Sequence, residues 1–127
     1  MVRCLIWGTG KAFSENAFMF DWYEEKKLMQ IIGVTSNEKY YSKILKWKFI
    51  DKHSIDINLF DFLIIAARDN ACREIEKEAK ELGIEAFRIV PYKVMQLQGF
   101  DFKKIRSYKE GYAYHICSKL LGRIDIS

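Results

Sequence analysis

The sequence predicts an α/β domain: an open parallel sheet of about five strands with flanking helices and a C-terminal helical tail. A short apolar segment, 4–7, runs directly into a Gly-x-Gly turn that opens a helix. Apolar segments then alternate with amphipathic stretches, which is the pattern of β-α-β units. With 127 residues, half of them hydrophobic, the chain is long enough for one domain with its own core.

The first half of the chain is expected to contain three strands and two helices. The strands are predicted at about 3–7, 30–35 and 47–50, and the helices at about 12–28 and, less regularly, 38–46. The almost continuous apolar run at 30–35 is typical of a strand covered on both faces of a parallel sheet. Five residues of the first helix are predicted to lie in the core: Phe13, Ala17, Phe18, Phe20 and Trp22.

The second half contains the clearest strand, 61–67, which is fully apolar after its first residue and is placed at the sheet centre. Asp69 or Asn70 is expected to cap the next helix, and Gly83 to end it. The apolar positions of that helix recur at spacings of four, four and three, as one helix face requires. They are Ala71, Ile75, Ala79 and Leu82.

A fifth strand is expected at 85–90, where Pro91 ends it, and a mostly helical tail at about 102–121, broken by Gly111. We therefore divide the chain into a domain at 1–91 and a tail at 92–127. The tail carries apolar residues that either form a homodimer contact or cover the sheet edge. These are Tyr108, Tyr112, Tyr114, Ile116, Leu120 and Leu121.

Composition excludes several classes of protein. Residues 1–90 hold 14 Lys/Arg and 14 Asp/Glu, and residues 91–127 hold 7 and 3, so the net charge of +4 comes from the tail. The tail alternates charges with aromatics, as a solvated helix face does, so no nucleic-acid partner is expected. Three distant cysteines argue against disulfides and zinc. The longest apolar run is far shorter than the ~20 residues of a membrane span, and we expect a cytoplasmic protein.

The glycine turn predicts a phosphate site. Glycine alone lets the backbone turn sharply against a phosphate, and the N–H groups of the following helix attract an anion. A complete dinucleotide fingerprint has a third glycine or alanine where this chain has Phe13. The phosphate loop of NTPases is excluded, because Leu5 replaces its first glycine and Ala12 its magnesium-binding hydroxyl. A tight turn that binds nothing stays open as an alternative.

Residues for catalysis or metal binding are not evident. The only Tyr-x-x-x-Lys match, Tyr23 to Lys27, lies inside the first predicted helix and not after the fifth strand, where a short-chain epimerase needs it. His53 and His115 lack a ligand or acid at a suitable spacing, and Cys117 faces away from His115 on a helix. Cys4, in a buried strand, is expected to be inert.

Four segments together resemble a known family: LIWGTGKA at the start, IIGVTSN at the second strand, DFLIIAA at the central strand and KELGIEAFRIVP near residue 91. They are similar to the Rossmann-like module of nucleoside-diphosphate-sugar epimerase/dehydratase proteins of bacterial polysaccharide biosynthesis. The similarity covers about residues 3–91. The sequence also resembles the nucleotide-sugar-binding front domain of sugar acetyltransferases from the same pathways.

The resemblance implies a ligand at three segments. It places a phosphate or diphosphate near Gly8, Thr9, Gly10, Lys11 and Ala12, a base or ribose near Thr35, Ser36 and Asn37, and further contacts at Ala66, Ala67 and Arg68. The family usually has aspartates after the second strand, and Ser36-Asn37 replace them here, so the carboxylate for both ribose hydroxyls is missing. No arginine follows to bind a 2′-phosphate, and Lys39 is the only cation nearby in sequence. NAD(P) or a UDP-sugar is the most plausible cofactor or ligand, with coenzyme A also open.

Three functions follow as hypotheses. The first is a nucleotide or nucleotide-sugar binding module in bacterial polysaccharide biosynthesis, not catalytic alone and acting with a partner catalytic domain or subunit. The second is a Rossmann-like interaction or regulatory domain that has lost its ligand. The third is an NAD-dependent sugar-nucleotide epimerase or dehydratase, which requires a catalytic base that the motifs do not supply.

Overall fold

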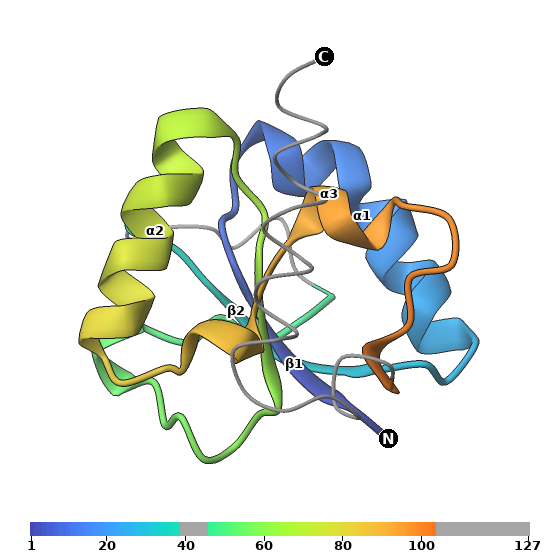
Figure 1. The fold of residues 1–127 in the computed structure, drawn as a ribbon, viewed down its shortest axis with the longest axis horizontal. Coiled ribbons are helices and arrows are strands. Elements are labelled where there is room, and N and C mark those ends of the chain that lie inside the picture. The colour runs from blue at the N-terminus through green and yellow to red at the C-terminus, as the bar shows by residue number, and fades with distance from the viewer. Residues whose placement is uncertain (39–45, 104–127) are drawn as a thin grey trace.

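A computed structural model describes residues 1–38 and 46–103 (Figure 1). Within them four strands form one parallel sheet, in the order β2-β1-β3-β4. The strands are β1 (Arg3–Trp7), β2 (Gln30–Thr35), β3 (Phe62–Ile65) and β4 (Ile89–Pro91). The helices are α1 (Lys11–Glu25), α2 (Asp69–Glu81) and the short α3 (Tyr92–Met95). This is a Rossmann-like α/β arrangement, and β3 lies at the sheet centre, as predicted for the strand at 61–67, with β1 beside it.

Alternating side chains of the central strands build a core on each face of the sheet. Cys4 and Ile6 of β1 pack on the face that α1 and α3 cover, and Leu5 and Trp7 pack on the face that α2 covers. Figure 1 shows α2 on one side of the sheet and α1 with α3 on the other. None of the helices in the described residues is long and apolar enough to cross a membrane.

The predicted strand at 47–50 is wrong, so the sheet of the described residues has four strands and not about five. This segment forms only an isolated parallel bridge, Val34 with Phe49, at the outer edge of β2. Two backbone bonds of 2.8 Å hold it, from Val34 N–H to Lys48 O and from Ile50 N–H to Val34 O. A Cβ at Gly33 would lie 2.5 Å from Ile50 Cδ1, so glycine is what allows this close approach.

Helix α1 begins one residue earlier than predicted and ends at Glu25, three residues before the predicted end. Lys27 adopts the left-handed region with φ 58°. Its N–H bonds to Glu24 O at 3.0 Å, and the N–H of Leu28 bonds to Tyr23 O at 2.9 Å. These two bonds form the Schellman motif that usually carries a glycine. The helix end was therefore missed because lysine stands where glycine would have indicated a stop.

The aromatic residues of α1 divide between core and surface. Phe13 and Phe20 are buried, whereas Phe18 is 73% exposed and Trp22 is 48% exposed, which corrects their assignment to the core. Seven residues at 100° each bring Phe20 back to the face of Phe13, and Phe18 and Trp22 fall on the opposite face. Ala17 is half-buried.

Helix α2 ends where predicted but begins earlier, at Asp69. Arg68 occupies the N-cap position without a side-chain capping bond, so neither Asp69 nor Asn70 is the cap. Ile75 and Ala79 are buried as predicted, whereas Ala71 and Leu82 are exposed, because the sheet covers only a narrow stripe of this helix. Gly83, with φ 96°, ends the helix as expected.

The strand predicted at 85–90 is shorter and shifted. Residues Ala86–Arg88 form a 3-10 helix, η3, and β4 then includes Pro91 as its last residue. Arg88 bonds to the carbonyl oxygens of Ile57, Phe60 and Asp61 at 2.6, 2.7 and 3.1 Å, and this replaces strand pairing before β4. The strand predicted at 61–67 likewise narrows to β3.

Several predictions lie outside the described residues. These are most of the helix expected at 38–46, nearly all of the helical tail with its apolar residues, and Lys39, His115 and Cys117. Residues 92–95 follow β4 directly, and Tyr92, Val94 and Met95 are buried in the same core as Val90.

Gly8 joins the carboxyl ends of three strands. It follows β1 with φ 128°, a conformation that side chains disfavour. Its N–H donates to Thr35 O at the end of β2 at 2.8 Å, and an added Cβ would lie 2.4 Å from Ala66 O, just after β3. A side chain at Gly8 would therefore push two strand ends apart.

We expect Gly8→Ala to lower the free energy of unfolding by about 3 kcal/mol, because it combines left-handed strain with a backbone clash. Gly10→Ala is the matched control, since its Cβ would meet nothing within 4 Å, and it should change stability by less than about 1 kcal/mol. Urea unfolding of both variants measures the difference. Equal stabilities would contradict this role of Gly8.

We expect Lys27→Gly to raise the free energy of unfolding by about 0.5–1 kcal/mol, because glycine removes the cost of the left-handed conformation while adding some unfolded-state entropy. Lys26→Gly changes the preceding residue, whose φ is −81°, and should lower stability by a similar amount. Thermal unfolding of the two variants should give shifts of opposite sign.

Candidate functional site

A cavity of about 430 Å³ lies at the carboxyl ends of β1, β2 and β3. Ten of the eleven predicted ligand residues line it: Gly8, Thr9, Gly10, Lys11, Ala12, Ser36, Asn37, Ala66, Ala67 and Arg68. Segments far apart in the sequence thus meet at one edge of the sheet, where open α/β sheets bind ligands. Sequence reasoning missed four further lining residues, Trp7, Glu38, Ala71 and Ile75.

Thr35 is the predicted residue that does not line the cavity. Its side chain is fully buried, and its Oγ1 has no hydrogen-bond partner in the described part of the chain. Its carbonyl oxygen accepts from Gly8 N–H. Thr35 therefore acts through its backbone, by positioning the glycine turn.

The start of α1 forms one wall of the cavity. Gly10 is exposed, occupies the N-cap position and makes no side-chain cap, and the first turn of this 15-residue helix contains no acidic residue. Space is open around Gly10, since an added Cβ would meet nothing within 4 Å. Lys11 is exposed and makes no ion pair or hydrogen bond with the part of the chain that the structure describes. Free N–H groups, a helix dipole and an ammonium here all favour an anion.

The end of β2 forms the second wall. Asn37 Oδ1 accepts from the indole N–H of Trp7 and from Nζ of Lys52, each at 3.2 Å. Ser36 Oγ bonds to the N–H and the carbonyl of Glu38, which closes a turn after the strand. Glu38, the residue after Asn37, also lines the cavity, and the ammonium of Lys52 reaches Asn37 at this wall.

Arg68, after the end of β3, forms part of the third wall and bonds to residues of α1 and α3. Its Nε donates to the Tyr92 hydroxyl at 3.0 Å and its Nη2 to Glu15 Oε1 at 2.7 Å. The hydrogen bond to Tyr92, and then the negative charge of Glu15, raise the pKa of Arg68 above its ordinary value. The guanidinium stays charged, and of its two partners Tyr92 is buried and Glu15 is exposed.

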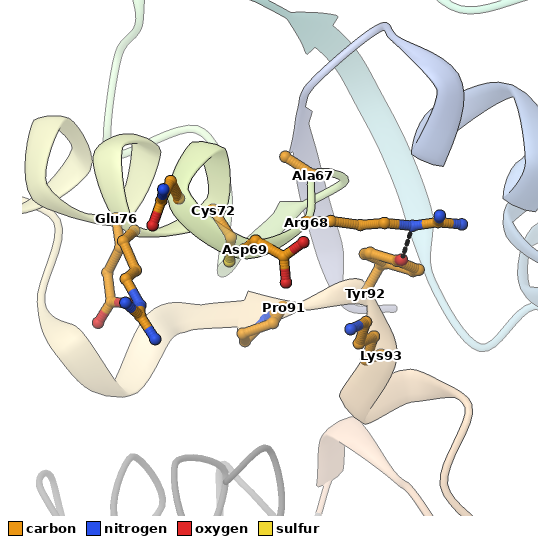
Figure 2. A pocket seen from close by; sticks show the side chains of 10 residues that line it. Ala67, Arg68, Asp69, Cys72, Glu76, Pro91, Tyr92 and Lys93 are labelled. Carbon is orange, nitrogen blue, oxygen red and sulfur yellow. Dashed lines mark hydrogen bonds between the residues drawn. The ribbon is translucent and has the colours of Figure 1, made fainter. Parts of the chain in front are cut away.

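A second cavity, of about 280 Å³, adjoins the first and shares Ala67 and Arg68 with it. Figure 2 shows Arg68 extending toward Tyr92 from the loop after β3, with Asp69 beside it and Lys93 below Tyr92. Arg73 and Glu76 of α2 also line this cavity. Asp69, which lines the second cavity, has a left-handed backbone with φ 48°.

Tyr23 and Cys4 line neither of these two cavities. Tyr23 is buried near the far end of α1, donates to Met95 O at 3.0 Å, and burial followed by the nearby Asp101 raises its pKa. A catalytic tyrosine needs the opposite shift. Burial also raises the pKa of the Cys4 thiol. Within the described residues no group of three or more His, Cys, Asp or Glu side chains is placed to hold a metal ion.

Comparison with solved structures finds similarity to an engineered D-amino acid dehydrogenase bound to NADP+. The identity is 16%, the TM-score is 0.49, and the match covers 71% of this chain and 26% of that one. The chain thus spans about a quarter of the length of that enzyme. No curated protein matches the sequence significantly.

The family comparison covers most of the chain. The family model described as "C2185-like, N-terminal" matches residues 1–90, which include the whole sheet apart from its last residue and every residue predicted to contact a ligand. The chain therefore belongs to the C2185-like N-terminal family.

Proposed function

We propose that this chain is a nucleotide-binding module that holds a phosphate or diphosphate at the turn from Gly8 to Ala12. One observation carries the proposal: the fold requires Gly8, whose Cβ would clash at 2.4 Å, but leaves open space around Gly10. A glycine that the fold does not need, at the start of a long helix and in a cavity, leaves room for a ligand to approach the backbone.

The rest of the ligand extends along the same edge. Asn37 and Glu38 face a base or ribose, and Ala66, Ala67 and Arg68 lead toward the second cavity, which has room for a sugar or the second half of a dinucleotide. NAD(P) and UDP-sugars both fit this division into a phosphate and two flanking groups. Ten cavity-lining residues come from the three segments in which the sequence resemblance implied contacts.

The biological context that we propose is bacterial polysaccharide biosynthesis, and it rests on the sequence resemblance alone. The Tyr23–Lys27 match does not supply a base at the cavity, because Tyr23 is buried and its hydroxyl is bonded to Met95 O. The module would therefore bind the nucleotide or nucleotide sugar and leave the reaction to a partner domain or subunit, or to a second copy of the chain.

One observation favours an alternative, a regulatory or interaction domain that has lost its ligand. Arg68, which the resemblance assigns to the ligand, is already bonded to Tyr92 and Glu15. A site of this kind would keep the geometry of the turn without binding. The same binding experiment separates the two functions.

We expect the full chain to bind at least one of NAD, NADP, UDP-glucose or coenzyme A, measured by isothermal titration calorimetry. Gly10→Asp should abolish this binding, because it places a carboxylate where the phosphate would lie. Lys11→Ala should weaken it about tenfold, or about 1.4 kcal/mol, by removing one charge-assisted contact.

Two controls accompany this experiment. Lys48→Ala removes an exposed lysine outside the cavity and should leave affinity unchanged, and circular dichroism should show that Gly10→Asp is folded. If none of the four compounds binds the unaltered chain, the nucleotide-binding proposal fails and the regulatory alternative is favoured.

We expect NAD to bind more tightly than NADP, because the carboxylate of Glu38 lines the cavity and would repel a 2′-phosphate. Glu38→Gln should narrow that difference by strengthening NADP binding severalfold. The ratio of the two dissociation constants, at fixed ionic strength, is the measurement. An unchanged ratio would place Glu38 away from the 2′ position.

A further inference from the structure

The indole of Trp7 imposes a requirement on the wall after β2. Trp7 is only 1% exposed, and a buried indole N–H needs an acceptor, because leaving it unpaired is costly. The acceptor is Oδ1 of Asn37, 30 positions further along the chain, at 3.2 Å. One face of the Asn37 side chain is thereby committed to the protein.

Lys52 makes a second demand on the same oxygen. Its Nζ lies 3.2 Å from Asn37 Oδ1 and 3.4 Å from Oε1 of Glu78 on α2. The backbone at Lys52 is itself held in the 3-10 helix η2 (Lys52–Ser54), where the Asp51 carboxylate accepts from His53 N–H at 2.8 Å. The Lys52 side chain is therefore held at both ends, by its backbone in η2 and by the contacts of its ammonium group.

These two partners determine which way the Asn37 amide is oriented. An indole N–H and an ammonium can only donate, so the atom that faces both must be the oxygen. The amide nitrogen is then turned away from them, and it makes no hydrogen bond within the described residues, while Asn37 itself lines the ligand cavity. Rotation of the amide by 180° would place its NH2 group, a donor, against two other donors, the Trp7 indole and the Lys52 ammonium.

We infer that Asn37 is a fixed hydrogen-bond donor, positioned by Trp7 and Lys52, which makes the site select a ligand group that accepts a hydrogen bond there. This inference rests on the proposed nucleotide-binding function and specifies its ligand. A carboxylate at this point accepts hydrogen bonds from ribose hydroxyls, whereas the amide nitrogen can only donate hydrogen bonds. The neighbouring Glu38 carboxylate disfavours an anion, so the accepting group is uncharged, such as a base carbonyl or a ribose oxygen.

The orientation of Asn37 is tested first, without ligand, by ¹H–¹⁵N NMR of the full chain. The indole N–H peak of Trp7 should shift strongly in Asn37→Ala and measurably in Lys52→Met, and Lys52→Arg should restore it because arginine also donates. Lys48→Met, an exposed lysine of the neighbouring segment, is the matched control and should leave the peak in place. A Trp7 indole peak at the same position in Asn37→Ala, in Lys52→Met and in the unaltered chain would overturn the inference.

The selection of an acceptor is tested with the tightest binder among NAD, NADP, UDP-glucose and coenzyme A. Asn37→Asp should weaken its binding at least tenfold, and more than Asn37→Ala does, because a carboxylate then faces an acceptor. Lys52→Met should weaken it less, and Lys52→Arg should restore it.

The outcomes separate the two proposals. Unchanged or tighter binding by Asn37→Asp overturns the inference and leaves the nucleotide-binding function standing, since it would mean that a ribose hydroxyl donates at this position. NADP as the tightest binder, weakened by Asn37→Asp, would show a charged acceptor and overturn the uncharged assignment. Failure of all four compounds to bind the unaltered chain overturns the proposed function, and this inference with it.

Discussion

The close contact of Gly8 with the ends of two neighbouring strands is the constraint on which the candidate site depends. Its N–H is bonded to Thr35 O, and its Cα lies against the backbone of Ala66, with no room for a side chain. Because β2 and β3 flank β1, this one residue holds three carboxyl ends together at the edge where the strand order reverses. The cavity lies where the chain leaves that junction and enters α1.

Packing and specificity are connected at the same edge. Trp7 packs in the core beneath α2, and its buried N–H fixes the amide of Asn37 at the cavity wall. At the other end of α1, Glu24 likewise accepts from an indole. Its two carboxylate oxygens accept from Ile31 N–H and from the Trp47 indole N–H, each at 2.8 Å. In both places an indole in the core dictates the orientation of a polar side chain, because a buried donor must be paired.

The cations at the cavity walls in the described part of the chain are ion-paired, apart from Lys11. Arg68 is paired with Glu15 and Lys52 with Glu78, so both cations already have partners when no ligand is bound. Lys11 has none among the described residues, and it stands at the helix start beside the open space at Gly10. A ligand phosphate would thus find one free ammonium, while the paired cations hold the walls in place.

The sequence by itself determined the features that neighbouring residues encode. The apolar run of β1, the Gly-x-Gly turn, the buried Ile75 and Ala79 and the stop at Gly83 all follow from local pattern and backbone preference. Local pattern failed where a residue acted against its preference, as Lys27 does in a left-handed cap, and where one helix face had to be chosen for Phe18 and Trp22. Only the tertiary structure brought Lys52 to Asn37 and Glu15 to Arg68, because these contacts depend on how strands pair and helices pack across 15 and 53 positions of chain.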